Sequence, residues 1–508
     1  MTLRVPESLA DDRLLDIRAA VGNSRVKRFF WTFTPFRNYT NLDGLKTKDL
    51  RVTQTTLDAV ALFMAAVPAK FFKQQRKAAG LKPEKGVYIA PVVVMMTILQ
   101  RLEQGKGTLS MVVQQLLSGR LGKLVPGRHK RIKEDSLAVG TGAYSRARTR
   151  LPLAVAEGVC DQVAEHLLAD QKEALPGLGR PAYFLDGTSF TLPHTEEILK
   201  LYPPASNQNG ESHWPVARTV VAHDLVSGIG LRPAWGPMYG KEAVSEQALA
   251  ELIIDRIPAR SILVHDRNFG TFAVTWYADQ KKHDTVGRLT DARARKLNKG
   301  KLPQHADQWM DWTPSRCDLK SNPHLPADAR LRVRFISTQV MRKGKLIQLY
   351  LFTTLDLPVA QIVELYGLRW NIELDIRSLK QTLHLHALRA ITPNMAAKEL
   401  VLAVTAYNFV RGAIQVAAQA AGIDPRRISF SRAQDVINAC LPNLQAADSK
   451  KKYEYLLVQM LRRIAQCKLP ESSHRASHPR VVWPRRSAFP KNKPGWQAPQ
   501  GLSCAVNP

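Results

Sequence analysis

Apolar positions recur every three to four residues over several long segments, a period that predicts amphipathic helices. In the first third of the chain these segments cover residues 55–66, 90–103, 110–118 and 152–169. Near the C-terminus they cover 394–420, 431–440 and 451–467. The pattern therefore predicts two helical regions, one on each side of a different central region.

The central region alternates short apolar runs with helical patterns. The runs that predict strands end at Asp186 and Asp266 or cover 218–223, 229–234 and 285–289, with a turn at 224–228 that predicts a hairpin. Helical periodicity covers 242–257 and 272–282. Further strand-like runs at 332–337 and 346–354 are joined by a basic turn at 342–345. Alternating strands and helices predict an α/β core.

Charge indicates what this core binds. The chain has 73 Lys and Arg residues against 43 Asp and Glu residues, for a net charge of +30. Such an excess predicts a polyanionic partner. A membrane surface is the other candidate, but no secretory leader pattern opens the chain. The apolar stretches 87–99 and 400–410 are also shorter than the roughly 20 residues that a membrane span needs. We therefore expect a nucleic-acid partner, no membrane and a cytoplasmic location.

The five cysteines are widely separated and form no Cys-x-x-Cys pair. This argues against a structural zinc site and agrees with reduced thiols in a cytosol.

Basic segments outside the core favour DNA contacts without establishing them. Residues 25–33 set three basic residues before four aromatic ones, which suits base stacking or, equally, a buried anchor. The basic segment 144–151 suits a loop around a DNA backbone or a helix with a broad basic arc. We interpret 1–175 as a helical DNA-binding region, with an ordinary helical bundle as the alternative. Residues 468–508 are basic and rich in proline, which predicts an extended tail. Two alternatives are open: the tail becomes ordered when it binds DNA, or it is a solvated terminus without function.

Three acidic residues are candidates for catalysis. Asp186 and Asp266 each follow a short apolar run, so each is expected at the end of a buried strand. Glu373 lies in a helical segment. Carboxylate oxygens suit Mg²⁺ or Mn²⁺, and two such ions about 3.5–4 Å apart can promote phosphodiester cleavage. Singly, each Asp could equally be a turn or cap residue.

The segment around Glu373 gathers cationic and phenolic groups on one side of a predicted helix. At about 100° per residue, four positions fall within roughly 60° of Tyr366. They are Arg369, Glu373, Arg377 and Lys380. Apolar residues from 365 to 383 form the neighbouring face. The arrangement suits a ligand with negative charge and a metal ion, although an exposed Glu373–Arg377 ion pair is the simpler reading.

These motifs together resemble bacterial insertion-sequence transposases of the Asp-Asp-Glu class, in particular the branch with a Tyr-x2-Arg-x3-Glu-x6-Lys motif. Tyr366, Arg369, Glu373 and Lys380 occupy its four positions. Asp186-Gly-Thr and Asp266-Arg-Asn-Phe-Gly match the two Asp motifs, with Asn268 at a variable position. The resemblance covers about 181–390.

The resemblance implies an RNase H-like fold in which Asp186, Asp266 and Glu373 bind two Mg²⁺ or Mn²⁺ ions. It implies that Tyr366, Arg369 and Lys380 contact the phosphates of the element's terminal DNA. Geometry adds Arg267 and Arg377 as DNA-contacting candidates. The implied partners are double-stranded element ends and target DNA, and the joining of two ends implies at least a homodimer. A nucleoid-associated bacterial protein is expected.

The interval between Asp266 and Glu373 is far longer than the roughly 30 residues that one helix-and-strand return needs. We infer a β-rich insertion at 291–355. The related transposases carry a β insertion here that can hold an extruded base against an aromatic ring. Trp309 and Trp312 are the candidates for that contact, although a tryptophan is more often a core residue.

The predicted architecture is an α/β, RNase H-like catalytic core interrupted by a β-rich insertion, between helical N- and C-terminal regions. The predicted division is 1–175 (DNA-binding region), 176–290 (first part of the core), 291–355 (insertion), 356–390 (core helix with Glu373), 391–467 (C-terminal helices) and 468–508 (basic tail). The predicted function is a DNA transposase that cleaves element ends and transfers strands into target DNA. The alternatives are a stand-alone metal-dependent nuclease and a non-catalytic DNA-binding relic.

Overall fold

The computed structural model describes residues 59–469 except 83, 85, 104–106, 120, 122–123, 126–129, 135, 170–178, 208–209, 343–344, 384–387 and 389. It also describes two short strands, β1 (Thr2–Leu3) and β2 (Ile17–Arg18), which pair antiparallel. The aromatic and basic segment 25–33 and nearly all of the basic tail, from residue 470 on, lie outside the described residues, as do Lys343 and Gly344 of the predicted basic turn.

One mixed sheet organises the described part of the chain. Its strands run in the order β4-β5-β3-β7-β8-β11-β10-β9, and β6 pairs with β5. Strand β3 is antiparallel to β5 and parallel to β7, which is parallel to β8. The strands are β3 (Ala182–Thr191), β4 (Pro204–Asn207), β5 (Gly210–Asp224), β6 (Ala234–Pro237), β7 (Ile262–His265), β8 (Asp284–Arg288), β9 (Ala306–Trp312), β10 (Leu331–Arg342) and β11 (Lys345–Thr353).

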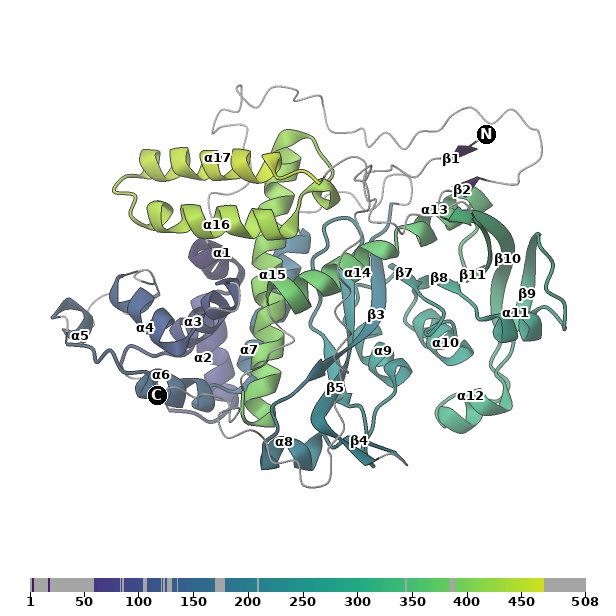
Figure 1. Ribbon diagram of the computed structural model, residues 1–508, viewed down its shortest axis with the longest axis horizontal. Helices are drawn as coiled ribbons and strands as arrows, with labels where there is room; N and C mark the ends of the chain where they lie inside the picture. The colour runs from purple at the N-terminus through teal and green to yellow at the C-terminus, as the bar shows by residue number, and fades with distance from the viewer. Residues whose placement is uncertain are drawn as a thin grey trace.

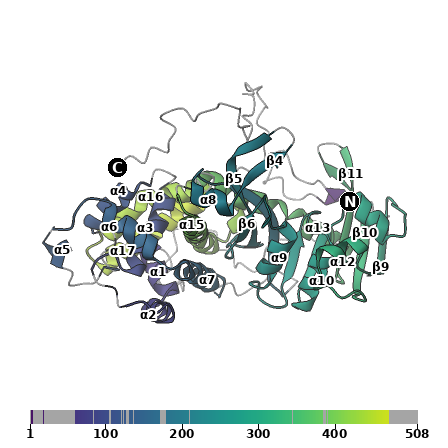
Figure 2. The same cartoon turned by 90° about the horizontal axis from the view of Figure 1, so that it is seen from below.

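Helices cover both faces of this sheet because its central strands are apolar on both sides. Leu185 and Leu263 pack in one hydrophobic cluster with α9 (Glu246–Ile254), and α10 (Phe272–Gln280) lies on the same side. Phe184 and Val264 pack in another cluster with α13 (Val359–Gly367) and α14 (Trp370–Arg377). Figure 2 shows α9 and α10 on the side of the sheet away from α13. The predicted α/β architecture is confirmed.

The helices before and after the sheet pack together as one body around α15 (Pro393–Ala421). Figure 1 shows α1 to α6 gathered on the side of α15 away from the sheet, and α15 contacts α3, α7, α16 and α17. The members are α1 (Ala59–Ala66), α2 (Ala69–Ala78), α3 (Ala90–Leu102), α4 (Leu109–Leu117), α5 (Lys130–Lys133), α6 (Gly142–Arg150), α7 (Leu153–Ala169), α16 (Phe430–Gln445) and α17 (Lys450–Gln466).

Helix α15 is buried in the protein along most of its length. The helix is long and apolar enough to cross a membrane by length and composition, but 94% of that window is buried inside the protein. Its buried Glu399 pairs with Arg101 of α3 at 2.6 Å and with Arg148 of α6 at 2.8 Å. The helix is therefore the core of the helical body. The segment 144–151, for which loop and helix were both open, is mostly helix α6.

Residues 291–355 are rich in strands. They hold β9, β10 and β11 with two short helices, α11 (Asp291–Leu297) and α12 (Arg316–Ser321). Strand β11 pairs antiparallel with β8, so these strands extend the central sheet and share its core. A short helix, α8 (Glu196–Leu201), precedes β4.

The segment that carries Glu373 is not the single helix that its periodicity predicts. Helix α13 ends at Gly367, α14 begins at Trp370, and a π-helical turn, η3 (Ser378–Thr382), follows. The amide of Arg369 donates to the carbonyl of Tyr366 at 3.0 Å, and that of Asn371 donates to Leu368 at 3.0 Å. These three-residue spacings tighten the backbone and separate the two helices.

A buried charge network fixes α14 to its surroundings. Asp375 is fully buried and accepts two hydrogen bonds of 2.8 Å from Arg426, which lies in η4 (Pro425–Arg427). It also accepts from Arg411 and, at 2.8 Å, from the Tyr407 hydroxyl, both on α15. Burial alone would raise the pKa of Asp375, but Arg426 and Arg411 outweigh it and lower the pKa to about 2. The carboxylate is therefore charged in the folded protein.

We predict that Asp375→Ala lowers the free energy of unfolding by about 3–5 kcal/mol, because it leaves two buried guanidinium groups uncompensated. Chemical or thermal unfolding measures this. Asp448→Ala, at an exposed acid that pairs with Lys452, is the matched control and should change stability by less than about 0.5 kcal/mol. Since folding lowers the pKa from 3.8 to about 2, this contribution is present above pH 4 and lost as pH falls toward 2. Equal stability of the two variants would contradict the prediction.

Candidate active site

Strand register brings Asp186 and Asp266 side by side. The parallel pairing of β3 and β7 ends with Leu185 opposite His265, so the next residues on the two strands are the two aspartates. Phe184 packs toward α13 and α14, and side chains alternate along a strand. Asp186 therefore points to the side of the sheet where α14 lies. The prediction that the two residues come from neighbouring central strands is confirmed, but Asp186 lies in the middle of β3 and not at its end, whereas Asp266 directly follows β7.

Helix α14 carries Glu373 to the same place, because it packs against β3. The guanidinium of Arg369 lies between the carboxylates, with Nη2 3.1 Å from Oε1 of Glu373 and Nη1 3.9 Å from Oδ2 of Asp186. Burial opposes the charge on Arg369, but Tyr366 and the surrounding carboxylates outweigh it and raise its pKa. Three elements far apart in sequence thus meet around one cationic side chain.

The negative charge of Asp186 is disfavoured in the folded protein, mainly by burial. Burial raises the pKa of Asp186 to about 7, and the nearby Asp266 and Glu373 add to the effect. Arg369 and the backbone amide of Gly187, which donates to Oδ1 at 2.8 Å, act in the opposite direction. A site that penalises its own negative charge in this way favours an added cation.

The chemistry of these side chains fits a hard divalent cation. Asp186, Asp266 and Glu373 offer carboxylate oxygens, the ligands that Mg²⁺ and Mn²⁺ prefer. Among the residues that the structure describes, no three acidic, histidine or cysteine side chains surround one point closely enough to hold an ion as they stand. At this site the Arg369 guanidinium contacts both Asp186 and Glu373.

Two other residues of the predicted motif also face this site. Tyr366 is only 5% exposed, and burial raises its pKa. Lys380 lies on η3 with Nζ 5.3 Å from the centre of the Phe190 ring. Burial lowers the pKa of Lys380, while the nearby Asp186 acts to raise it. Tyr366 is thus more enclosed than a residue on an open helix face would be.

The remaining predicted residues lie farther out. Arg377 ends α14 and is partly exposed, and Arg267 is exposed directly after Asp266. Trp309 and Trp312 lie on β9, five strands from β3, which is roughly 24 Å at strand spacing. Figure 1 shows β9 at the far edge of the sheet. The structure does not bring either tryptophan to the three carboxylates.

The two tryptophans also differ from each other. Trp312 packs edge-to-face on Phe272 and Phe352, with ring centres 5.7 and 5.2 Å away. Trp309 is 36% exposed. This favours a core role for Trp312 and leaves Trp309 as the better candidate for a base contact.

Sequence reasoning missed one carboxylate next to this site. Glu246, the first residue of α9, accepts a hydrogen bond from the side chain of Asn268. A Cβ atom on Gly187 would lie only 2.5–2.8 Å from its carboxylate. The Asp186-Gly187 pair was the available signal, because a glycine beside a functional residue can mark a close approach.

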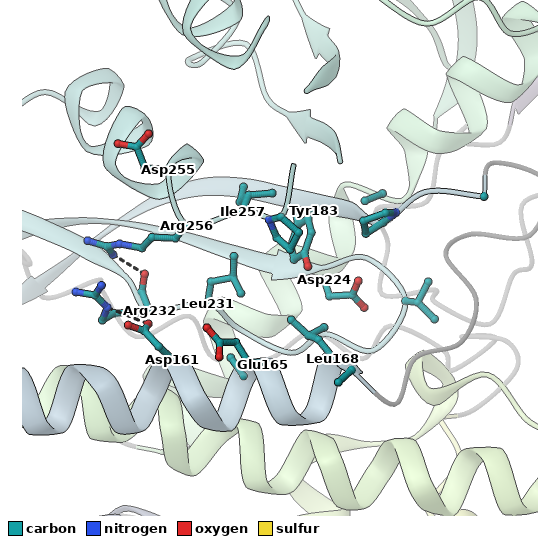
Figure 3. Close-up of a pocket in the computed structure, with 17 residues that line it drawn as sticks. Asp161, Glu165, Leu168, Tyr183, Asp224, Leu231, Arg232, Asp255, Arg256 and Ile257 are labelled. Carbon is teal, nitrogen blue, oxygen red and sulfur yellow. Dashed lines mark hydrogen bonds and ion pairs between the residues drawn. The ribbon is translucent and has the colours of Figure 1, made fainter. Parts of the chain in front are cut away.

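The cavity in Figure 3 is a separate feature. It has a volume of about 790 Å³ and lies between α7 and the start of β3, where it is lined by Tyr183, Asp224 and the ion-paired Asp161 and Arg232. None of the three candidate carboxylates lines it.

Comparison with known proteins shows which class of protein this chain resembles. Residues 177–409 match the family described as "Transposase DDE domain". This match and the relative described next support a DNA transposase of the Asp-Asp-Glu class, a family that binds DNA and generally uses divalent metal ions. The nuclease and relic alternatives are not favoured.

The chain is also similar to a named bacterial transposase. The chain is 28% identical over 318 residues to "Transposase InsG for insertion sequence element IS4" of Escherichia coli (strain K12). The match covers 60% of this chain and 68% of the relative. The matched sequence extends well beyond the short motifs around the acidic residues.

We predict that Mn²⁺ or Mg²⁺ raises the midpoint of thermal unfolding, because a cation offsets the repulsion between Asp186, Asp266 and Glu373. Asp186→Asn should largely remove this shift. Asp279→Asn, at an exposed residue of α10, should retain it. Equal shifts in the wild type and Asp186→Asn would contradict the prediction.

Proposed function

We propose that this transposase cuts element ends by hydrolysis at a site formed by Asp186, Asp266 and Glu373, and then joins the freed 3′-hydroxyl to target DNA. The observation that carries the proposal is the convergence of three acidic residues from β3, the end of β7 and α14 around Arg369. The carboxylates of Asp266 and Glu373 both raise the pKa of Asp186. Such a set suits phosphodiester chemistry better than acyl transfer, which would need a paired nucleophile and base.

The sheet supports an RNase H-like assignment for the core. Strands β6, β5, β3, β7 and β8 form three antiparallel-linked strands followed by two parallel ones. Helix α9 connects the antiparallel part to the parallel part. On this assignment, β9, β10 and β11 are the insertion, added at the β8 edge of the core.

The proposed chemistry divides the work between carboxylates and cations. When bound, two Mg²⁺ or Mn²⁺ ions would activate water and offset the charge that develops on the phosphate. Asp186, Asp266 and Glu373 would hold these ions. Arg369 would contact a DNA phosphate, and Tyr366 would orient the Arg369 guanidinium. Lys380 supplies a second phosphate contact, beside Asp186. These contacts position the DNA and do not read its sequence.

The helical body supplies a surface for longer DNA contacts. Arg146 and Arg150 are exposed on α6, and Arg131 is exposed on α5. Together with the net charge of +30, they support a DNA-binding role for the region before residue 175. We further propose that two copies join two element ends, and that the protein acts in the cytoplasm on nucleoid DNA.

Alanine substitution at Asp186, Asp266 or Glu373 should abolish cleavage of a labelled element end, because each change removes a cation ligand. DNA binding should persist, since the basic side chains remain. A gel-shift assay and a cleavage assay on the same preparations separate the two properties. Asp279→Ala is the matched exposed control and should cleave normally. Cleavage by all three active-site variants would refute the assignment.

Trp309→Ala should spare the first nick but slow a later step, if its exposed ring holds a base during end processing. Trp309→Phe keeps a stacking surface and should restore much of the rate. Time courses on a labelled element end resolve the two steps. Normal completion by Trp309→Ala would remove Trp309 from the mechanism.

A further inference from the structure

Glu246 lies between the two aspartate segments, on α9. Its carboxylate accepts a hydrogen bond from Nδ2 of Asn268, two residues after Asp266. It also fills the space beside Gly187, where a Cβ atom would come within 2.5 Å of its Cδ and 2.6 Å of its Oε1. One side chain thus contacts the residue after Asp186 and the turn after Asp266.

The turn after Asp266 depends on this helix in a second way. The backbone amide of Asn268 donates to Oδ1 of Asp266 at 2.8 Å, which sets the orientation of that carboxylate. Gln247 donates from Nε2 to the carbonyl of Asn268 at 3.0 Å. Asn268 is therefore held by two consecutive residues of α9 and in turn holds Asp266.

Local structure explains why Glu246 is available for this contact. The hydroxyl of Ser245 caps α9 by accepting from the amide of Ala248 at 3.0 Å, so the helix begins at Glu246. The side chain is partly buried, whereas Glu242, four residues earlier, is exposed. An acid in the first turn of a helix gains about 0.3–1 kcal/mol from the helix dipole. Stabilisation of the α9 N-terminus is therefore the purely structural role against which a functional role of Glu246 must be tested.

We propose that Glu246 is a positioning residue for DNA cleavage, which fixes Asp266 through Asn268 and sets its place relative to Asp186 through Gly187. The inference rests on the proposed function of Asp186 and Asp266. It accounts for the glycine of the Asp186-Gly187 pair, since any side chain at position 187 would displace the Glu246 carboxylate. It also gives Asn268 a role in the site.

The test compares Glu246→Ala, Asn268→Ala and the double variant in cleavage of a labelled element end. Each single change should slow cleavage at saturating DNA by about 10–100-fold, the usual effect of losing a residue that orients a metal ligand. The double variant should be no slower than the slower single variant, because both residues act through one contact. DNA affinity should stay unchanged, and Mn²⁺ binding, measured without DNA, should weaken.

Two further variants separate positioning from a structural role. Glu246→Gln keeps an oxygen that accepts from Asn268 and should recover most of the rate. Gly187→Ala leaves Glu246 in the chain but pushes its carboxylate aside, so it should slow cleavage as Glu246→Ala does. Glu242→Ala, at an exposed acid four residues before Glu246, should cleave at the wild-type rate.

Several results would overturn the inference. They are a wild-type rate for Glu246→Ala, losses that multiply in the double variant, or a rate loss matched by equal losses of DNA affinity and thermal stability. The proposed function fails separately, when the wild type does not cleave or the Asp186, Asp266 and Glu373 variants still do. An inactive Glu246→Gln with normal stability would also count against positioning through Asn268.

Discussion

The buried carboxylate of Asp375 is the constraint on which the proposed active site most depends. Helix α14 has only eight residues, and it carries Glu373 toward the site and Asp375 into the protein. Arg426, which pairs with Asp375, also donates to the carbonyls of Asp224 and Leu225 at the end of β5. A single charge cluster therefore joins α14, α15 and the sheet. Because such a cluster is stable only when all its members are present, it holds α14 in one position.

That rigidity has a function in a site made of like charges. Asp186, Asp266 and Glu373 repel one another, and nothing in their own chemistry would keep them together. Packing on both faces of the sheet fixes β3 and β7, and the Asp375 cluster fixes α14. Arg369 then neutralises part of the repulsion. The fold thus keeps three carboxylates close together although their mutual repulsion is unfavourable, and a bound cation would offset that repulsion. Such an arrangement is typical of functional sites.

Local pattern was sufficient for the features that depend on nearby residues. Apolar runs predicted β3 and β7 and the position of Asp266 directly after β7, but the prediction that Asp186 ends its strand was wrong because β3 continues to Thr191. Periodicity predicted α15 to within a residue or two at each end. The motif spacing identified Arg369 and Lys380 as neighbours of the carboxylates, and both lie near Asp186.

The features that were missed depend on distant partners. Asp375 resembles an ordinary polar helix residue, and its partners Tyr407, Arg411 and Arg426 lie 32 to 51 positions away. The break between α13 and α14 keeps helix-like periodicity, so spacing alone could not show it. The helices at the two ends of the chain were assigned to separate regions because their shared contact, α15, shows only in three dimensions.

The central claim is that Asp186, Asp266 and Glu373 share divalent cations beside the DNA strand that is cut. The most direct measurement is anomalous diffraction from crystals of the protein with a precleaved element end and Mn²⁺. Manganese peaks within about 2.0–2.6 Å of oxygens from all three side chains are the predicted result. Manganese bound elsewhere, with these oxygens too far apart to share an ion, would contradict the account.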